Sequence, residues 1–184
     1  MEQNEAAAVL ETPVQENTVR VDPEKVEAFM EQLTSEQRLP MGILGGIIAA
    51  LVGAAIWAGV TVATKYQIGW MAVGVGFLVG YTVRALGRGI SKSFGYIGGA
   101  CALIGCLLGN LFSSCGFISI QESLPFFRVV YAVITQPSVI GELLAATFSP
   151  MDLLFYGIAV AEGYKFSFRQ ITEAERAALL AGAA

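Results

Sequence analysis

The chain has 184 residues and a formal net charge of −4, and 55% of its residues are hydrophobic while only 14% are charged. Soluble domains carry about 25% charged residues, so this composition argues against an ordinary soluble protein. Between Met41 and Ile120 there is no acidic residue, and long uncharged runs predict membrane-spanning helices. We expect an all-α integral membrane bundle whose first partner is the lipid bilayer, with no nucleic-acid partner.

The N-terminal residues are expected to lie outside the membrane. Residues 1–21 are acidic and polar without a regular apolar face, which is typical of a disordered tail. Residues 22–38 are predicted to form an amphipathic helix, because Asp22 and Pro23 make a helix-start signal and apolar side chains recur at helical spacing. These side chains are Val26, Phe29, Met30 and Leu33. The helix either rests on the membrane surface or on the bundle, or it docks a soluble partner.

A transmembrane domain is expected over residues 41–169. Three long runs predict transmembrane helices at about 41–64, 67–84 and 94–117, since only four charged residues interrupt this part of the chain. These are Lys65, Arg84, Arg88 and Lys92.

The next apolar stretch, residues 121–148, contains Arg128, Pro137 and Glu142. A charge at the bilayer centre costs several kcal/mol. We therefore expect this stretch to be an interfacial outer segment of two short helices, broken at the proline.

A fourth transmembrane helix is expected at about 150–166, where Ser149 and Asp152 flank a proline at the first helical position. Residues 170–184 are predicted to form a C-terminal cytoplasmic tail, with a short helix that begins at Thr172.

The orientation follows from the basic residues, which concentrate in short cytoplasmic loops. Arg84, Arg88 and Lys92 fall between the second and third helices, whereas the preceding link holds only Lys65. Both termini are then predicted to be cytoplasmic. We favour four spans, because a fifth span at 124–148 would place the C-terminal basic residues outside.

The glycine-rich stretch MAVGVGFLVGYTVRALGRG, residues 71–89, does not match a nucleotide-binding loop. The dinucleotide fingerprint is G-x-G-x-x-G with an acidic residue about 20 positions later. Here Gly74 and Gly76 are followed by Gly80, one residue late, and no acidic residue comes before Glu122.

Small residues recur at four-residue steps, which predicts flat helix faces that pack closely in lipid. The candidate packing positions are Gly46, Gly53, Gly76, Gly80, Gly95, Gly99, Gly105 and Gly109. The sequence leaves open whether these faces meet within one chain or between chains. Gly87 and Gly89 are instead expected to give freedom to a turn, so that Gly87→Ala should be mild.

The residues that usually carry chemistry are scarce. There is no histidine, and the three cysteines form no C-x-x-C pair. Cys101 and Cys106 are expected to be packing residues, whereas Cys115 is close enough to the outer end to cross-link two chains. We predict no metal site, no cofactor, no catalytic residue and no enzyme activity.

Three polar residues are candidates for a functional site. Asn110 is predicted to hydrogen-bond across helices, or to line a transport path. Asp152 is predicted to start a helix. Glu162 either pairs with Lys165 or a basic loop residue, or binds a proton or cation. No special role is expected for three others: Thr61, Thr64 and Gln67.

Two blocks carry a resemblance to known proteins. YQIGWMAVGVGFLVGYTVRALGRG and MDLLFYGIAVAEGYKFSF resemble a group of small bacterial inner-membrane proteins with no assigned function. The resemblance implies a helical domain in the bacterial inner membrane and implies no activity. The small-residue ridges also resemble those of glycine-zipper proteins of the mitochondrial protein translocase, in architecture only.

The sequence favours a structural, assembly or accessory-subunit role in a membrane, as a homo-oligomer or with other membrane proteins. The alternative is a small oligomeric transporter or channel. A continuous polar lining would distinguish the second from the first, and the sequence offers few polar residues for one.

Overall fold

The computed structural model describes residues 23–181, which contain eight helices and no strand. The expected tail over residues 1–21 and the cap at Asp22 lie outside the described residues. The chain divides into two units, Met30–Gln170 and a smaller unit of Met1–Phe29 with Ile171–Ala184. Each unit is considered by itself.

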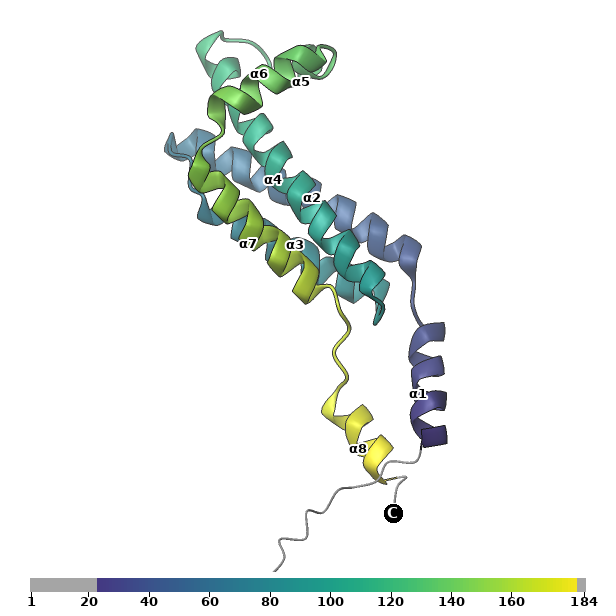
Figure 1. Ribbon diagram of the computed structural model, residues 1–184. Helices are drawn as coiled ribbons and strands as arrows, with labels where there is room; N and C mark the ends of the chain where they lie inside the picture. Colours follow the sequence, from purple (N-terminus) through teal and green to yellow (C-terminus); the bar gives the residue numbers. More distant parts are fainter. Residues whose placement is uncertain (1–22, 182–184) are drawn as a thin grey trace, which may run out of the picture. The chain divides into compact units, whose positions relative to one another are not determined.

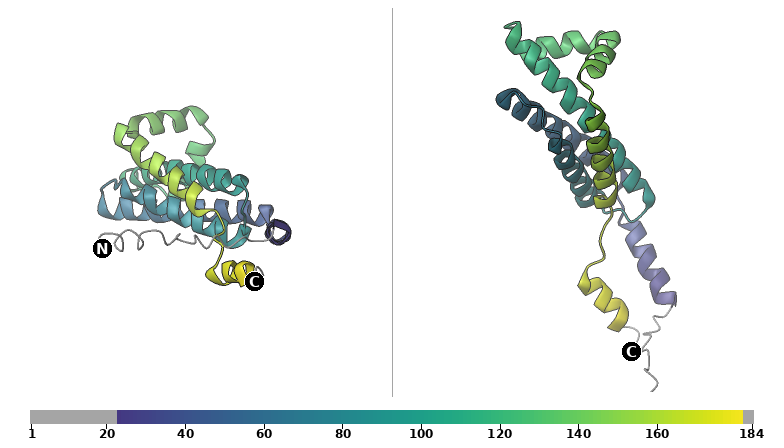
Figure 2. Two further views of the ribbon diagram at one scale, coloured as in Figure 1. Left: turned by 60° about the horizontal axis from the view of Figure 1, so that its bottom comes forward. Right: turned by 60° about the vertical axis from the view of Figure 1, so that its left-hand side comes forward.

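The larger unit is a helical bundle. Its four main helices are α2 (Leu39–Thr64), α3 (Trp70–Gly87), α4 (Lys92–Gln121) and α7 (Pro150–Phe166). They lie side by side in Figure 1 and in both views of Figure 2, with α7 packed on α3 and α4, and α2 packed on the other side of these two helices. The buried centre consists mainly of small residues, valines and a few aromatic rings.

Three of these helices, α2, α3 and α4, are long and apolar enough to cross a membrane, and a fourth span would require α5 and α6 to count as one. α5 (Phe126–Ile134) and α6 (Pro137–Thr147) are bent by 109° relative to each other. The prediction of two short helices broken at Pro137 is therefore confirmed. Both helices pack against the far end of α4, where Val129 and Val133 are buried with Leu111.

α7 occupies residues 150–166, as expected, and its start has the predicted chemistry. The Ser149 hydroxyl caps the helix, and the Asp152 carboxylate accepts a hydrogen bond of 2.8 Å from the Ser149 backbone N–H. The helix has 17 residues, about 26 Å in length, and is not among the three helices of spanning length.

The second transmembrane helix was predicted three residues too early at both ends. α3 begins at Trp70 and continues to Gly87, so Arg84 lies in its last turn and not in a loop. Arg88 ends the helix in the left-handed conformation, with φ of 47°, and donates its backbone N–H to the Arg84 carbonyl. Because α4 begins at Lys92, the link between them is only residues 88–91.

The helices at the two termini have the expected start signals. α1 (Pro23–Ser35) has proline as its first residue, and α8 (Glu173–Ala181) follows a capping box between Thr172 and Glu175. Of the apolar face predicted on α1, Leu33 is buried whereas Val26 and Met30 are exposed.

Six basic residues gather at one end of the bundle, which we call the basic end. The N-terminal ends of α2 and α4 and the C-terminal ends of α3 and α7 meet there (Figure 1). The basic residues at these four helix ends are Arg38, Arg84, Arg88, Lys92, Lys165 and Arg169.

Candidate functional site

The predicted small-residue faces meet within one chain. All eight candidate glycines are buried, and a Cβ added at any of them would contact a neighbouring helix. At Gly76 that contact is with backbone, 2.5 Å from the Ala159 carbonyl oxygen and 2.8 Å from its Cα. A Cβ added at Gly105 would lie 3.3 Å from the Ala50 Cα, and one added at Gly109 would contact the Trp57 ring. Close approach of α3 to α7 and of α2 to α4 therefore depends on these positions.

The sequence analysis missed a further close contact. Gly98 of α4 and Gly163 of α7 face each other so closely that a Cβ on either would meet the backbone oxygen of the other. Gly98 also continues by four-residue steps to Ala102 and Cys106, both buried. That step was the signal that could have identified it.

The expectation for Gly87 and Gly89 was wrong. Neither has a positive φ, so neither supplies turn freedom. Both give space to the buried Phe94 ring: a Cβ at Gly87 would lie 2.6 Å from that ring, and one at Gly89 would overlap it. Gly42 completes the pocket around Phe94, so we call these four residues the Phe94 cluster.

Two chain segments are tied to the link between α3 and α4 at the basic end. The Arg38 backbone N–H donates to the Gly87 carbonyl and the Arg169 backbone N–H donates to the Gly89 carbonyl, each at 2.8 Å. The Arg169 guanidinium also pairs with Glu36 at 2.6 Å. A hydrogen bond from Arg169 and, to a lesser extent, one from Gln32 hold the pKa of the Glu36 carboxyl below its ordinary value.

Near the opposite end of the bundle, a buried polar cluster lies between α2, α4 and α7. Its buried members are Trp57, Thr61, Asn110 and Tyr156, and the exposed Gln67, in the link between α2 and α3, forms a hydrogen bond to it. The Gln67 amide donates to the Asn110 Oδ1 at 3.4 Å, so Asn110 accepts a hydrogen bond from a distant segment and Gln67 has a partner. The Tyr156 hydroxyl donates to the Cys106 carbonyl at 3.5 Å.

Three polar atoms of this cluster are unpartnered among the described residues. They are the Trp57 Nε1, the Thr61 Oγ1 and the Asn110 Nδ2, in side chains that are 0%, 1% and 2% exposed. The indole N–H and the amide NH₂ can only donate, so together with a hydroxyl they are suited to hold an acceptor such as water. The sequence indicated Asn110 alone, because neither the indole nor Thr61 looks unusual in an apolar helix.

The other two candidate polar residues are placed apart from each other. Asp152 is buried at its helix start, within electrostatic range of the Tyr156 hydroxyl. Glu162 is half-buried nearer the basic end, and no ion pair joins it to Lys165 in the described part of the chain. α7 presents the buried Ala159 between them. Asp152 therefore borders the polar cluster, and Glu162 does not.

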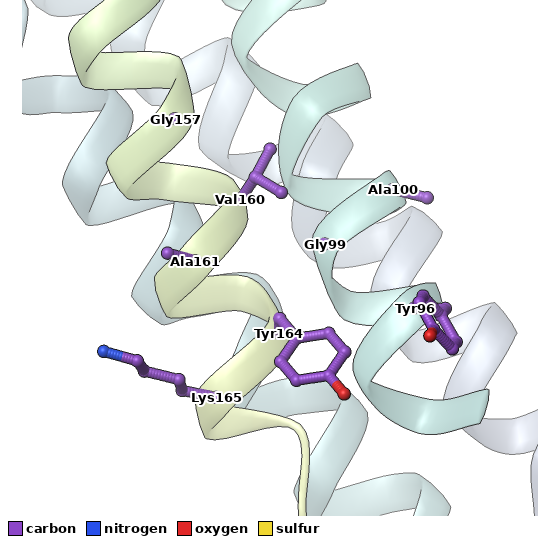
Figure 3. Close-up of a pocket in the computed structure, with 8 residues that line it drawn as sticks. All are labelled: Tyr96, Gly99, Ala100, Gly157, Val160, Ala161, Tyr164 and Lys165. Atoms are coloured by element: carbon purple, nitrogen blue, oxygen red, sulfur yellow. The ribbon is translucent and has the colours of Figure 1, made fainter. Parts of the chain in front are cut away.

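A shallow groove of about 430 Å³ separates the exposed sides of α4 and α7 (Figure 3). Gly99, Ala100, Gly157 and Ala161 form its small-residue floor, and Val160 projects between the helices. A pair of tyrosines, Tyr96 and Tyr164, stands at its basic end with ring centroids 5.6 Å apart. Lys165 lies on the same rim.

The three cysteines are buried, and this burial argues against the cross-link between two chains that the sequence left open at Cys115. Cys101 and Cys106 are buried in the centre of the bundle. Cys115 is 1% exposed and packs with Val129 and Val133 of α5. Its thiol is therefore covered by its own chain.

No group of three or more His, Cys, Asp or Glu side chains within residues 23–181 is arranged to hold a metal ion. Comparisons with known protein families, with curated proteins and with solved structures gave no match to this chain. The arrangement of the bundle, its polar cluster and its groove is therefore the basis for proposing a role.

Proposed function

We propose that the protein is an integral protein of the bacterial inner membrane with a structural or accessory-subunit role, in which the helical bundle is a rigid support. The observation that carries this proposal is the backbone-to-backbone contact of small residues inside one chain, at Gly76 with Ala159 and at Gly98 with Gly163. Such contacts are characteristic of stable helix association in lipid.

The distribution of polar groups also favours a structural role over a pore. A continuous polar lining would favour a pore, whereas the polar cluster and Glu162 are separated by the buried Ala159 of α7. The eight candidate glycines are occupied within the chain, so an oligomer or a partner membrane protein would use the exposed apolar faces instead.

The proposed orientation places the basic end and both termini in the cytoplasm, because basic residues are retained on that side. In a Cys-free variant, a cysteine at Ser91, in the link at the basic end, is expected to stay unlabelled by an impermeant maleimide in intact cells. A cysteine at the exposed Tyr66, at the opposite end, should be labelled. The reverse pattern would show that the orientation is wrong.

The proposed role also predicts the effect of Glu162→Gln. A support protein does not need this charge, so the variant should reach wild-type membrane abundance and should rescue any phenotype caused by deletion of the gene. Glutamine keeps the size and hydrogen-bonding capacity of the side chain but cannot release a proton. Normal abundance with failed rescue would count against the support role.

A small transporter is the second candidate function, and the polar cluster is the observation that favours it. Unpartnered donors buried at membrane depth are costly, and they are often functional. Purified protein in liposomes should separate the two candidates: a support protein leaves the permeability to protons and alkali cations at the level of protein-free liposomes. A flux that Asn110→Ala or Glu162→Gln abolishes would establish the transporter.

A further inference from the structure

The groove between α4 and α7 combines an apolar floor with a basic, aromatic rim. We infer that it binds one anionic phospholipid, with an acyl chain along the small-residue floor and the phosphate at the lysine end. The inference rests on the proposed function, since it requires the bundle to lie in a bilayer.

The two helix ridges that form the groove have matching gradients of side-chain size and charge. At four-residue steps, α7 presents Leu153, Gly157, Ala161 and Lys165, and the antiparallel α4 presents Ile104, Ala100, Tyr96 and Lys92. Both ridges therefore begin with a large apolar residue, continue with one or two small residues and end in a lysine, with Tyr96 before the lysine on α4; Lys165 lines the groove and Lys92 lies one turn beyond its lining. This is the order of environments that a phospholipid meets from its chain to its phosphate.

The floor is open to an occupant. A Cβ added at Gly157 would meet nothing within 4 Å, in contrast to the glycines of the bundle interior. The distance along α7 from Gly157 to Lys165 is about 12 Å, compared with roughly 15 Å for one hydrocarbon leaflet. The groove thus lies within one leaflet, at the basic end.

The rim supplies the groups that recognise a phosphate. The tyrosines at the end of the groove offer hydroxyl donors at interface depth, as aromatic residues commonly do. Figure 3 shows Tyr164 beside the groove and Lys165 extending from the adjoining side of α7. The four-carbon stem of a lysine lets its ammonium turn to the mouth, and basic pockets between helices are sites for anionic headgroups.

Because the small-residue floor is short, it suits a lipid acyl chain better than a second helix. Each ridge has at most two small residues in succession, and on the side away from the basic end these are followed by the large, exposed side chains of Leu153 and Ile104. A helix is about 10 Å wide and needs small residues over several turns to approach closely. An acyl chain needs only the short floor.

Native mass spectrometry of the purified full-length protein in detergent micelles tests the inference, with phosphatidylglycerol and phosphatidylcholine as titrated lipids. Wild-type protein should bind one phosphatidylglycerol in preference to phosphatidylcholine. Gly157→Leu should weaken that binding about tenfold or more, because the added side chain removes several methylene contacts. Gly74→Leu is the matched control, since Gly74 is an exposed glycine of α3 that also has open space around a Cβ.

The headgroup contribution is tested with Lys92→Gln combined with Lys165→Gln. Each near-surface lysine contributes about 1 kcal/mol to anionic lipid binding, so losing both should weaken binding about 30-fold. Lys65→Gln, at the opposite end, should have no effect. Circular dichroism on each variant confirms that the bundle is folded.

Equal binding of the two lipids, or unchanged lipid binding in Gly157→Leu, would overturn the inference. An oligomer in the wild type that Gly157→Leu dissociates without changing lipid binding would show that a second chain fills the groove. Carbonate extraction of cell membranes tests the proposed function separately: protein that stays in the membrane but binds no lipid contradicts only the lipid site.

Discussion

Gly76→Leu is expected to prevent the bundle from folding, whereas Gly74→Leu, two residues earlier on the same helix, should leave it intact. At Gly76 a Cβ would lie 2.5 Å from the Ala159 carbonyl oxygen, and backbone cannot move aside as a flexible side chain can. At Gly74 a Cβ would meet nothing within 4 Å. Overpacking usually costs about 1–3 kcal/mol, and we expect Gly76→Leu to exceed that range.

The alanine variants at the two positions are expected to change the stability of the bundle in opposite directions. Replacing a mid-helix glycine by alanine stabilises a helix by about 0.5–1 kcal/mol where space allows. Gly74→Ala should therefore be neutral or stabilising, while Gly76→Ala should destabilise. The measurement is unfolding of purified protein in micelles, followed by helical circular dichroism. Equal stability of the two alanine variants would show that α3 and α7 do not meet at Gly76.

Phe94→Ala is expected to destabilise the bundle by about 3–5 kcal/mol, which is the usual cost of removing a buried phenyl ring. The ring is 1% exposed and fills the space between Gly42, Gly87 and Gly89. For the same reason Gly87→Ala should destabilise the wild-type protein, in contrast to the mild effect that the sequence predicts. Tyr96→Ala, on the exposed side of α4, is the control that should cost little.

A double-mutant cycle tests whether Gly87 is required by the ring itself. Without the ring the Cβ at position 87 loses its closest neighbour, so Gly87→Ala should cost at least about 1 kcal/mol less in the Phe94→Ala background. Phe94→Leu replaces Phe94→Ala in the cycle if the latter does not fold. Additive effects would mean that a different neighbour, such as the Gly42 Cα that a Cβ at Gly87 would meet at 3.1 Å, and not the ring, selects glycine at this position.

The element types followed from residue patterns that act locally. Uncharged runs located the long helices, and Ser149 with Asp152 placed the start of α7 correctly. The four-residue steps identified eight buried glycines, since a helix face is a property of one segment. The end of α3 was missed because Arg88, a residue with a side chain, adopts the left-handed conformation at which glycine is expected.

The contacts between distant segments could not be predicted from local sequence patterns. Gly87 and Gly89 look like turn residues until the packing of Phe94 is known. Gly74 and Gly76 look alike, although only the second faces α7. Likewise the polar cluster includes Trp57, whose burial depends on Gly109 of another helix, and Tyr96 and Tyr164 of the groove become neighbours only when α4 and α7 run antiparallel.

The position of α7 in the chain sets an order of events during synthesis. α3 and α4, which supply the glycine surface beneath α7, leave the ribosome first. In the proposed membrane arrangement, α7, which is short and contains Asp152, Glu162 and Lys165, would partition only weakly from the translocon into lipid by itself. In the proposed four-span arrangement α7 would therefore insert late, by packing against α3 and α4 after these helices have already assembled. A substitution in α3 that prevents this packing would then leave the C-terminus on the periplasmic side of the membrane instead of the cytoplasmic side.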